Sequence, residues 1–311
     1  MKNKLIVEIS EGLGNQLFMY AHAYALSKKL SYDLIIDNTS GYSKKKNHLR
    51  PHQKFMLDCL NINENFAESH LKYDTSLKKI LKKILIYMDN FSSKKKYLIE
   101  KTIKINNQKT VNDNINVNNI KFSNLLYVQG NFENYKFFEN FRDDFIKIFK
   151  PKNSLLNFKN PLIDSLKNSN SVSIHIRRNR FSDQRRLSND VANIEKSNAF
   201  TNQTINYINN SIKYINDRLS NPKFFIWSND FNNFNDISNK IKISDYTLVK
   251  SNDVIDDFYL FAHSKHFIVG PSSFHWWGAW LNENPDKICL RPANINPSNN
   301  KNFWPENWIT I

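Results

Sequence analysis

This sequence of 311 residues has very little cysteine, and it contains no long apolar run. Cys59 and Cys289 are its only cysteines, which are too few for a disulfide framework and lack the paired spacing of a zinc site. No segment approaches the roughly 20 apolar residues that a membrane-spanning helix needs. Glu8 interrupts the apolar stretch that an N-terminal signal sequence would require. We therefore expect a cytoplasmic protein that is not exported and binds no metal.

Acidic residues are also scarce relative to basic ones. The chain has 44 lysines and arginines against 29 aspartates and glutamates, a formal net charge of +15. Such an excess suits an anionic partner, which can be nucleic acid, a nucleotide phosphate or a membrane surface. Nucleic acid is disfavoured, because the aromatic residues lie in apolar periodic segments and no known nucleic-acid-binding motif occurs.

The remaining composition is that of a globular protein with two domains. Hydrophobic residues make up 40% of the chain, far above the level typical of disorder, and the length fits two domains of about 150 residues. A strand at 5–9, a glycine turn, a helix and a strand at 34–37 would form one βαβ unit. Strands are expected in the second half at 171–176, 223–228, 266–269 and 287–290, and helices at 201–219, 254–264 and 274–281.

This alternation predicts an α/β fold with a parallel sheet in each half. The break at Lys150-Pro151 places the domain boundary there, so the domains are residues 1–150 and 151–311.

Residues 76–88 have the pattern of a basic amphipathic helix. Leu77, Ile80, Leu81, Ile84, Leu85 and Met88 share one helical face, and Lys78, Lys79, Lys82 and Lys83 share the other. Two interpretations remain open. The apolar face packs on the first domain and the lysines are solvated, or the helix lies on anionic lipid, which the cluster Lys94–Lys96 would favour.

Polar and glycine-rich segments follow three of the predicted strands, where open parallel sheets bind their ligands. Gly12-Leu-Gly-Asn-Gln16 would let the backbone approach a phosphate or sugar, or would simply be a tight packing turn. It matches neither the dinucleotide fingerprint nor the phosphate-binding loop.

The second segment holds five arginines between Arg177 and Arg186. Adjacent arginines can bind a pyrophosphate bidentately, and the alternative is a surface loop paired with carboxylates. His175 alternates with two isoleucines, which by itself favours a structural histidine.

The third segment begins at Ser272 and Ser273, at the expected start of a helix where hydroxyls and backbone amides can bind an anion. Trp276, Trp277 and Trp280 follow at helical spacing and are expected in the core. Trp227-Ser-Asn-Asp230 ends another strand with side chains able to bond a ribose or a base edge.

Four segments together resemble the bacterial α-1,2-fucosyltransferases of glycosyltransferase family 11, in their order and rough spacing. They are Gly12–Phe18, His175–Arg178, Trp227–Asp230 and Ser272–Leu281. The resemblance implies a GT-B fold of two facing Rossmann-like halves, with the acceptor side in the first domain and the donor side in the second. It implies inverting transfer of fucose from GDP-fucose to a galactoside hydroxyl, with no metal or other cofactor.

The same resemblance implies a product that belongs to a bacterial surface glycan such as lipopolysaccharide or capsule. An acceptor built on a lipid carrier would bring the enzyme to the cytoplasmic face of the membrane as a peripheral protein.

The resemblance also implies roles for particular residues. Arg177 would contact the β-phosphate of the donor with support from Arg178, and His175 or Asp183 would assist catalysis, with Glu11 a further candidate for the base. Phosphate or nucleoside contacts are expected from Asn229, Asp230, Ser272, Ser273 and Phe274, and a position on the cleft between the domains from Gly12, Gly14, Asn15 and Gln16.

One residue departs from the family pattern. Arg180 stands where the family usually has aspartate, and Asp183 is expected to supply that carboxylate. Otherwise the donor is a different GDP-sugar, or the protein is a diverged glycan-binding relative without activity.

Overall fold

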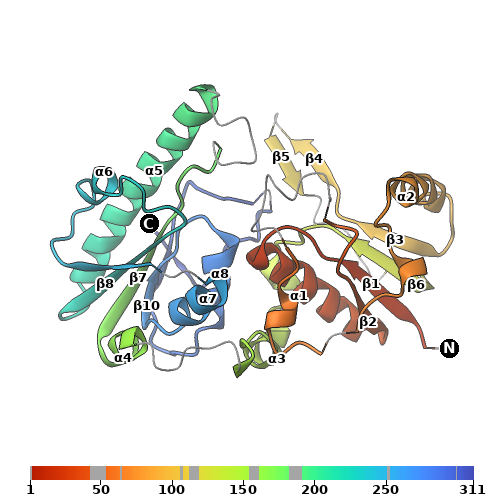
Figure 1. The fold of residues 1–311 in the computed structure, drawn as a ribbon, viewed down its shortest axis with the longest axis horizontal. Helices are drawn as coiled ribbons and strands as arrows, with labels where there is room; N and C mark the ends of the chain where they lie inside the picture. The colour runs from red at the N-terminus through yellow and green to blue at the C-terminus, as the bar shows by residue number, and fades with distance from the viewer. Residues whose placement is uncertain are drawn as a thin grey trace. The chain divides into compact units, whose positions relative to one another are not determined.

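The computed structural model describes residues 2–42, 54–63, 65–105, 108–111, 119–153, 161–181, 191–250, 253–298 and 300–311. The chain divides into two compact units, shown as ribbons in Figure 1. The first contains Met1–Phe149 and Ser298–Phe303, and the second contains Lys150–Pro297 and Trp304–Ile311. Each unit is built on a parallel sheet, so the predicted GT-B-like class of two Rossmann-like α/β parts is confirmed.

The first unit has a four-stranded parallel sheet in the order β2-β1-β6-β3. Its strands are β1 (Lys4–Glu8), β2 (Asp33–Asp37), β3 (Lys95–Ile99) and β6 (Phe122–Gln129). Helix α1 (Leu13–Leu30) connects β1 to β2, which completes the predicted βαβ unit. The ring of Phe18 on α1 lies 5.8 Å from that of Phe303, so the returning segment Ser298–Phe303 packs on this helix.

Shorter elements complete this unit. They are η2 (Leu57–Cys59), η3 (Ser69–Leu71), α2 (Ser76–Asp89), the antiparallel pair β4 (Thr102–Ile105) and β5 (Gln108–Val111), η5 (Tyr135–Phe137), η6 (Glu139–Phe141) and α3 (Arg142–Ile148).

The second unit has a six-stranded sheet in the order β12-β11-β10-β7-β8-β9, and every pair is parallel. Its strands are β7 (Asn170–Ile176), β8 (Pro222–Ser228), β9 (Tyr246–Val249), β10 (His266–Ile268), β11 (Cys289–Arg291) and β12 (Ile309–Thr310). Its helices are α4 (Pro161–Asn168), α5 (Val191–Asn216), α6 (Asn235–Ser238), α7 (Val254–Phe261) and α8 (Ser273–Leu281).

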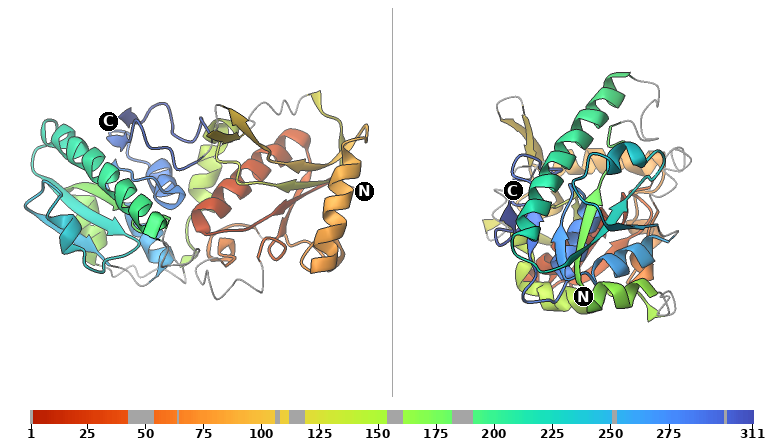
Figure 2. Two further views of the ribbon diagram at one scale, coloured as in Figure 1. Left: turned by 90° about the horizontal axis from the view of Figure 1, so that it is seen from above. Right: turned by 90° about the vertical axis from the view of Figure 1, so that its left-hand side faces the viewer.

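The long helix α5 packs on the sheet of this unit (Figure 2). Ile205, Ile208 and Ile212 of α5 share one buried cluster with Val172 and Ile174 of β7. The apolar side chains of β7 thus lie in the core of this unit.

Helix α2 confirms the predicted helix, but the interpretation that its apolar face packs on the first domain is wrong. Lys82 is buried at 6% exposure, whereas Leu77 is 78% exposed and Ile84 is 51% exposed. The helix therefore presents its apolar face to solvent. None of the described helices has the length and apolar character that a membrane crossing requires.

Candidate active site

The candidate residues of the second unit follow three neighbouring strands. β7 pairs with β10 on one side and with β8 on the other, all in parallel. Parallel strands end at the same edge of a sheet, so the loops after β7, β8 and β10 converge there. Arg177 and Arg178 lie in the first of these loops, Asn229 and Asp230 in the second, and Ser272 in the third.

The loops after β7 and β8 are joined through Asn229. Its Oδ1 accepts a hydrogen bond from the backbone N–H of Arg178 at 2.7 Å, and its Nδ2 donates to the carbonyl of Arg178 at 3.2 Å. Nη1 of Arg178 donates to the carbonyl of Asp230 at 3.2 Å and to that of Asn232. These bonds give Arg178 and Asn229 a positioning role, and their predicted donor contacts remain predictions.

Asp230 is held by the same two loops. Its Oδ2 accepts from Nδ2 of Asn179 at 2.7 Å, and its Oδ1 accepts from the N–H of Asn232 at 2.9 Å. Asn179 has a φ of 53°, in the left-handed region that asparagine tolerates better than most residues. An ionised carboxylate has about four acceptor positions, so Asp230 keeps the capacity to accept from a ligand hydroxyl.

Arg180, the departure from the family pattern, connects two further loops. Its Nη1 donates to the carbonyl of Pro271 at 3.3 Å, and its Nη2 donates to the carbonyl of Pro297 at 2.9 Å. The guanidinium also lies 5.2 Å from the ring centre of Phe200 on α5. Arg180 therefore fixes the segment that leads into α8. Asp183, the predicted substitute carboxylate, lies outside the described residues.

The loop after β10 packs directly on the end of β7 through Gly270. A Cβ at this position would lie 2.3 Å from the carbonyl oxygen of His175 and 2.7 Å from its Nδ1, so only glycine fits. The ring of His175 stacks on that of His275 of α8, with centroids 3.7 Å apart. These contacts bring α8 to the end of β7, directly before Arg177.

His175 does not fit its predicted role in catalysis. It is 1% exposed, and burial together with the positive charge of Arg177 lowers its pKa to about 3. The pKa of His275 is lowered for the same reasons, with His175 contributing as well. A neutral imidazole enclosed in the core is a weak base and does not reach a substrate, so the two stacked histidines are structural.

The N-terminus of α8 offers hydrogen-bond donors to an anion. Ser272 is the N-cap, and its side chain makes no capping hydrogen bond. Ser272, Ser273 and Phe274 are half-buried, and their backbone amides stand at the start of α8. These amides and the positive end of the helix dipole favour a bound anion. The charge of the half-buried Arg177 acts in this region too, since it lowers the pKa of His275 on the same helix.

The tryptophans of α8 are core residues, as predicted. Trp276 and Trp277 are completely buried, and Trp280 is 6% exposed. Trp276 and Trp280 stack with their ring centroids 5.5 Å apart. Their packing fixes α8, which therefore presents its first turn in one position.

The residues of the glycine turn in the first unit, Gly12 to Gln16, differ in how deeply they are buried. Gly12 is the N-cap of α1, and among the described residues no atom beyond its chain neighbours lies within 4 Å of where its Cβ would be, whereas Gly14 is buried and Asn15 is half-buried. Gln16 is fully buried. Its Nε2 donates to the carbonyls of Glu11 and Lys54, and its Oε1 accepts from the N–H of Met56. The side-chain amide of Gln16 therefore joins two segments of the core, and its predicted position on the cleft between the domains remains a prediction.

A family model described as Glycosyl transferase family 11 matches residues 4–311. The chain belongs to glycosyl transferase family 11. It is 29% identical over 312 residues to an Alpha-1,2-colitosyltransferase of Escherichia coli, covering 99% of this chain and 98% of the relative. It is 26% identical over 326 residues to the O-antigen biosynthesis glycosyltransferase WbnK of Escherichia coli, covering 97% and 99%. A structure of NodZ alpha-1,6-fucosyltransferase co-crystallized with GDP is 12% identical, with a TM-score of 0.49 and coverage of 90% and 92%.

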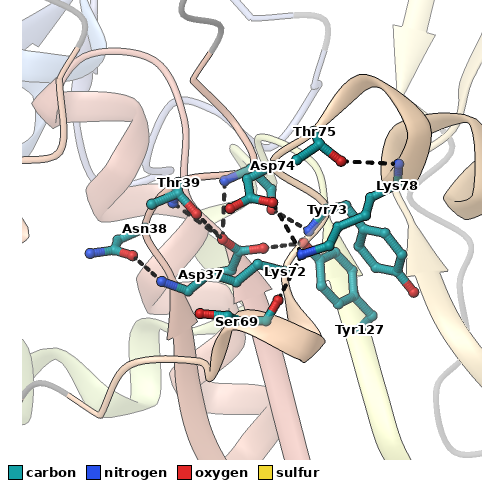
Figure 3. Close-up of polar contacts among 11 residues, drawn as sticks. Asp37, Asn38, Thr39, Ser69, Lys72, Tyr73, Asp74, Thr75, Lys78 and Tyr127 are labelled. Atoms are coloured by element: carbon teal, nitrogen blue, oxygen red, sulfur yellow. Dashed lines mark hydrogen bonds and ion pairs between the residues drawn. The ribbon is translucent and has the colours of Figure 1, made fainter.

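This family 11 glycosyltransferase also contains a polar cluster that sequence reasoning missed. Glu8 and Asp37 end the adjacent strands β1 and β2, opposite each other in register. The hydroxyl of Tyr127 lies 2.9 Å from Oε2 of Glu8 and 2.6 Å from Oδ2 of Asp37, and Nζ of Lys82 donates to Oε2 of Glu8 at 2.6 Å. Figure 3 shows Asp37 and Tyr127 within this part of the first unit. The sequence signal that could have revealed this cluster is the pair of acidic residues, Glu8 and Asp37, on the first two predicted strands.

Burial dominates the electrostatics of the cluster. It raises the pKa of Tyr127, and the two carboxylates add to this shift. It lowers the pKa of Lys82, although the attraction of Glu8 opposes the change. The ammonium group also lies 4.3 Å from the ring centre of Tyr127. In this glycosyltransferase the cluster connects α2 to the sheet.

Proposed function

We propose that this glycosyltransferase moves fucose from GDP-fucose to a galactoside hydroxyl, forming an α-1,2 linkage with inversion, in a bacterial surface glycan. The observation that carries the proposal is the packing of Gly270 on His175, which brings the first turn of α8 to the end of β7, directly before Arg177. A helix N-terminus beside a guanidinium suits the two phosphates of a nucleotide sugar. Membership of family 11 supports glycosyl transfer as the reaction.

The chemistry of transfer explains why positive groups belong at this edge. The bond between the anomeric carbon and the β-phosphate oxygen breaks, and the leaving GDP gains negative charge as the sugar becomes oxocarbenium-like. Arg177 and the amides of Ser273 and Phe274 would stabilise that charge, and removal of one such donor typically costs about 100-fold to 1,000-fold in kcat. In this proposal these groups replace a divalent cation.

Inversion requires the acceptor oxygen to attack from the face opposite GDP and to lose its proton as the new bond forms. The burial of His175 disfavours it as the base in this proposal. Asp183 and Glu11 remain the candidates for the base.

The donor sugar is the part of the proposal that most needs a test. One relative carries the name Alpha-1,2-colitosyltransferase. Colitose is fucose without its 3-hydroxyl, and a pocket that hydrogen-bonds this hydroxyl would discriminate strongly between the two sugars.

A donor panel tests the proposal. GDP-fucose, GDP-colitose and GDP-mannose are compared by the rate of GDP release, with and without a β-galactoside acceptor. We expect the highest kcat/KM for GDP-fucose and release that depends on the acceptor. A tenfold preference for another donor would mean that this sugar, and not fucose, is the one transferred. If no donor gives acceptor-dependent GDP release, the result would favour a glycan-binding relative without activity.

A further inference from the structure

Helix α2 has an apolar surface that is exposed in the described part of the first unit. Five side chains of its outer face, Leu77, Ile80, Ile84, Tyr87 and Met88, are between 51% and 78% exposed. Phe91, which follows the helix, is also 78% exposed. Leu81, at 49% exposure, completes the surface. These seven residues, Leu77, Ile80, Leu81, Ile84, Tyr87, Met88 and Phe91, form what we call the α2 apolar face.

A buried ion pair of Lys82, in the middle of the helix, keeps this apolar face exposed. Nζ of Lys82 lies 2.6 Å from Oε2 of Glu8, at the end of the central strand β1. The same ammonium lies 4.3 Å from the ring centre of Tyr127 and 5.3 Å from that of Tyr73. Rotation of the helix to bury its apolar face would leave Glu8 buried without its cation, which is strongly unfavourable.

Both ends of α2 are fixed in the same orientation. At the first turn, Nζ of Lys78 donates to the carbonyl of Ser69 at 2.8 Å and to Oδ1 of Asp74 at 3.3 Å (Figure 3). At the last turn, the carboxylate of Asp89 accepts from the backbone N–H groups of Lys96 and Tyr97. Three separate contacts therefore hold the exposed apolar face in place, so the exposure is built into the fold.

The charges around the α2 apolar face identify what it fits. Lys79 is half-exposed, and Lys83, Lys94 and Lys96 are exposed. Between Ser76 and Lys96 the only acidic residue is Asp89, and its side chain is buried. From Ser76 to Lys96 the exposed charges beside the apolar side chains are thus all positive, and Asp74 before the helix is paired with Lys78. Apolar side chains flanked by lysines are the combination that binds the interface of an anionic bilayer.

We propose that α2 inserts its apolar face into an anionic lipid surface and that its flanking lysines contact the headgroups. Tyr87 and Phe91 suit the boundary between headgroups and acyl chains, where aromatic side chains concentrate. A second copy of this chain fits the surface less well, because pairing two such faces would bring lysines of both copies together. The proposal does not depend on which sugar or acceptor the enzyme uses.

Flotation with vesicles measures the contact directly, using the full chain without donor or acceptor. The vesicles contain equal parts of phosphatidylcholine and phosphatidylglycerol, or phosphatidylcholine alone. We expect the wild type to bind the anionic vesicles at low salt. The double variant Leu77→Gln, Ile84→Gln should bind at least tenfold more weakly at every salt concentration. Lys79→Gln, Lys83→Gln should bind several-fold more weakly at low salt and show a shallower salt dependence.

The matched control changes two exposed apolar residues of the second unit. Val191→Gln, Ile194→Gln removes side chains that are 66% and 40% exposed on α5, and it should bind vesicles as the wild type does. Circular dichroism checks that each variant melts at the wild-type temperature. Transfer to a short soluble acceptor should be unchanged in Leu77→Gln, Ile84→Gln.

Three outcomes would overturn the proposal. The wild type fails to bind anionic vesicles at low salt, or the Leu77, Ile84 variant binds as well as the wild type. In the third outcome the wild type sediments as a dimer that this variant converts to a monomer, which would make the surface an interface between copies. Vesicle binding is measured without turnover, so it can fail while the proposed transfer reaction stands.

Discussion

Nζ of Lys82 and Oε2 of Glu8 lie 2.6 Å apart in the interior of the first unit, although 74 residues separate them in the sequence. Their side chains are only 7% and 10% exposed. This pair reverses the usual orientation of an amphipathic surface helix, because it holds Lys82 in the interior while the apolar face of α2 stays exposed. It also makes Lys82 different in kind from the neighbouring Lys83, which is exposed.

Removal of one partner of this pair should be costly. Lys82→Met leaves Glu8 buried without its cation, and we expect a loss of about 3 to 5 kcal/mol in the free energy of unfolding. The matched variant Lys83→Met should change it by less than about 0.5 kcal/mol. Urea unfolding measures both. In the double variant Lys82→Met, Glu8→Gln the loss should be smaller than the sum of the single losses, and simple additivity would show that the two side chains do not interact.

Arg177 should matter for turnover and not for folding. In Arg177→Ala the stabilisation of the leaving phosphate is lost, so kcat should fall by at least about 100-fold while the melting temperature stays within a few degrees. Arg177→Lys should recover part of the rate, because it restores the charge without the bidentate geometry. The exposed Arg218 provides the control, since Arg218→Ala should leave kcat unchanged. Wild-type turnover in Arg177→Ala would refute the assigned role.

Arg180 should act through the loop that it holds. Arg180→Ala removes the hydrogen bonds to the carbonyls of Pro271 and Pro297, which frees the segment leading into α8. We expect kcat/KM for the donor to fall about tenfold, since small displacements of positioning residues are costly. Arg180→Asp should be worse because a carboxylate would face the same carbonyls. An active Arg180→Asp variant would mean that the loop does not need this cation.

The carboxylate role given to Asp183 can be tested separately. Asp183→Asn should lower kcat more than Asp190→Asn, a change of the same kind in the same segment. Equal and small effects would show that transfer proceeds without this carboxylate, and would favour a donor other than GDP-fucose.

Acid should destabilise the protein through its buried histidines. Burial lowers the pKa of His22 from 6.5 to about 3, and its ring stacks between those of Phe132 and Phe137. The unfolded state binds a proton below pH 6.5 that the folded state refuses, so stability falls as the pH drops from 6.5 toward 3. At pH 5.5 this histidine alone should cost about 1.4 kcal/mol. Stability measured at pH 7.5 and 5.5 tests the sign.

His22→Phe isolates this contribution. Among the described residues neither ring nitrogen of His22 has a hydrogen-bond partner, so phenylalanine fits the slot between the two rings without losing a bond. The variant should be less sensitive to acid than the wild type by about 1.4 kcal/mol between the two pH values. His70→Gln, at an exposed position, is the control. An unchanged pH dependence in His22→Phe would contradict the assignment.

Chelation tests the proposal that arginine and helix amides do the work of a divalent cation. Activity should persist in excess EDTA and should not rise on addition of magnesium or manganese. Loss of activity in EDTA that returns with either metal would overturn the metal-independent reaction.

Sequence alone determined the architecture of both units and much of the candidate site. Strand and helix periodicity predicted the parallel sheets. The polar residues after β7, β8 and β10 marked these three segments as candidate ligand-binding loops. The core position of Trp276 and Trp277 also followed from their spacing. These features are local, or follow from the rule that parallel strands end at one edge.

Tertiary structure decided which face of an amphipathic helix is buried and which partner each polar side chain contacts. The periodicity of α2 defines two faces, but only the distant Glu8 determines that Lys82 is buried and the apolar face is exposed. Likewise, Gln16, His175 and Arg180 have the residue types of ligands, yet each contacts backbone or rings that lie far away in the sequence. A sequence pattern states what a side chain can bond, and only packing chooses the partner that compensates its burial.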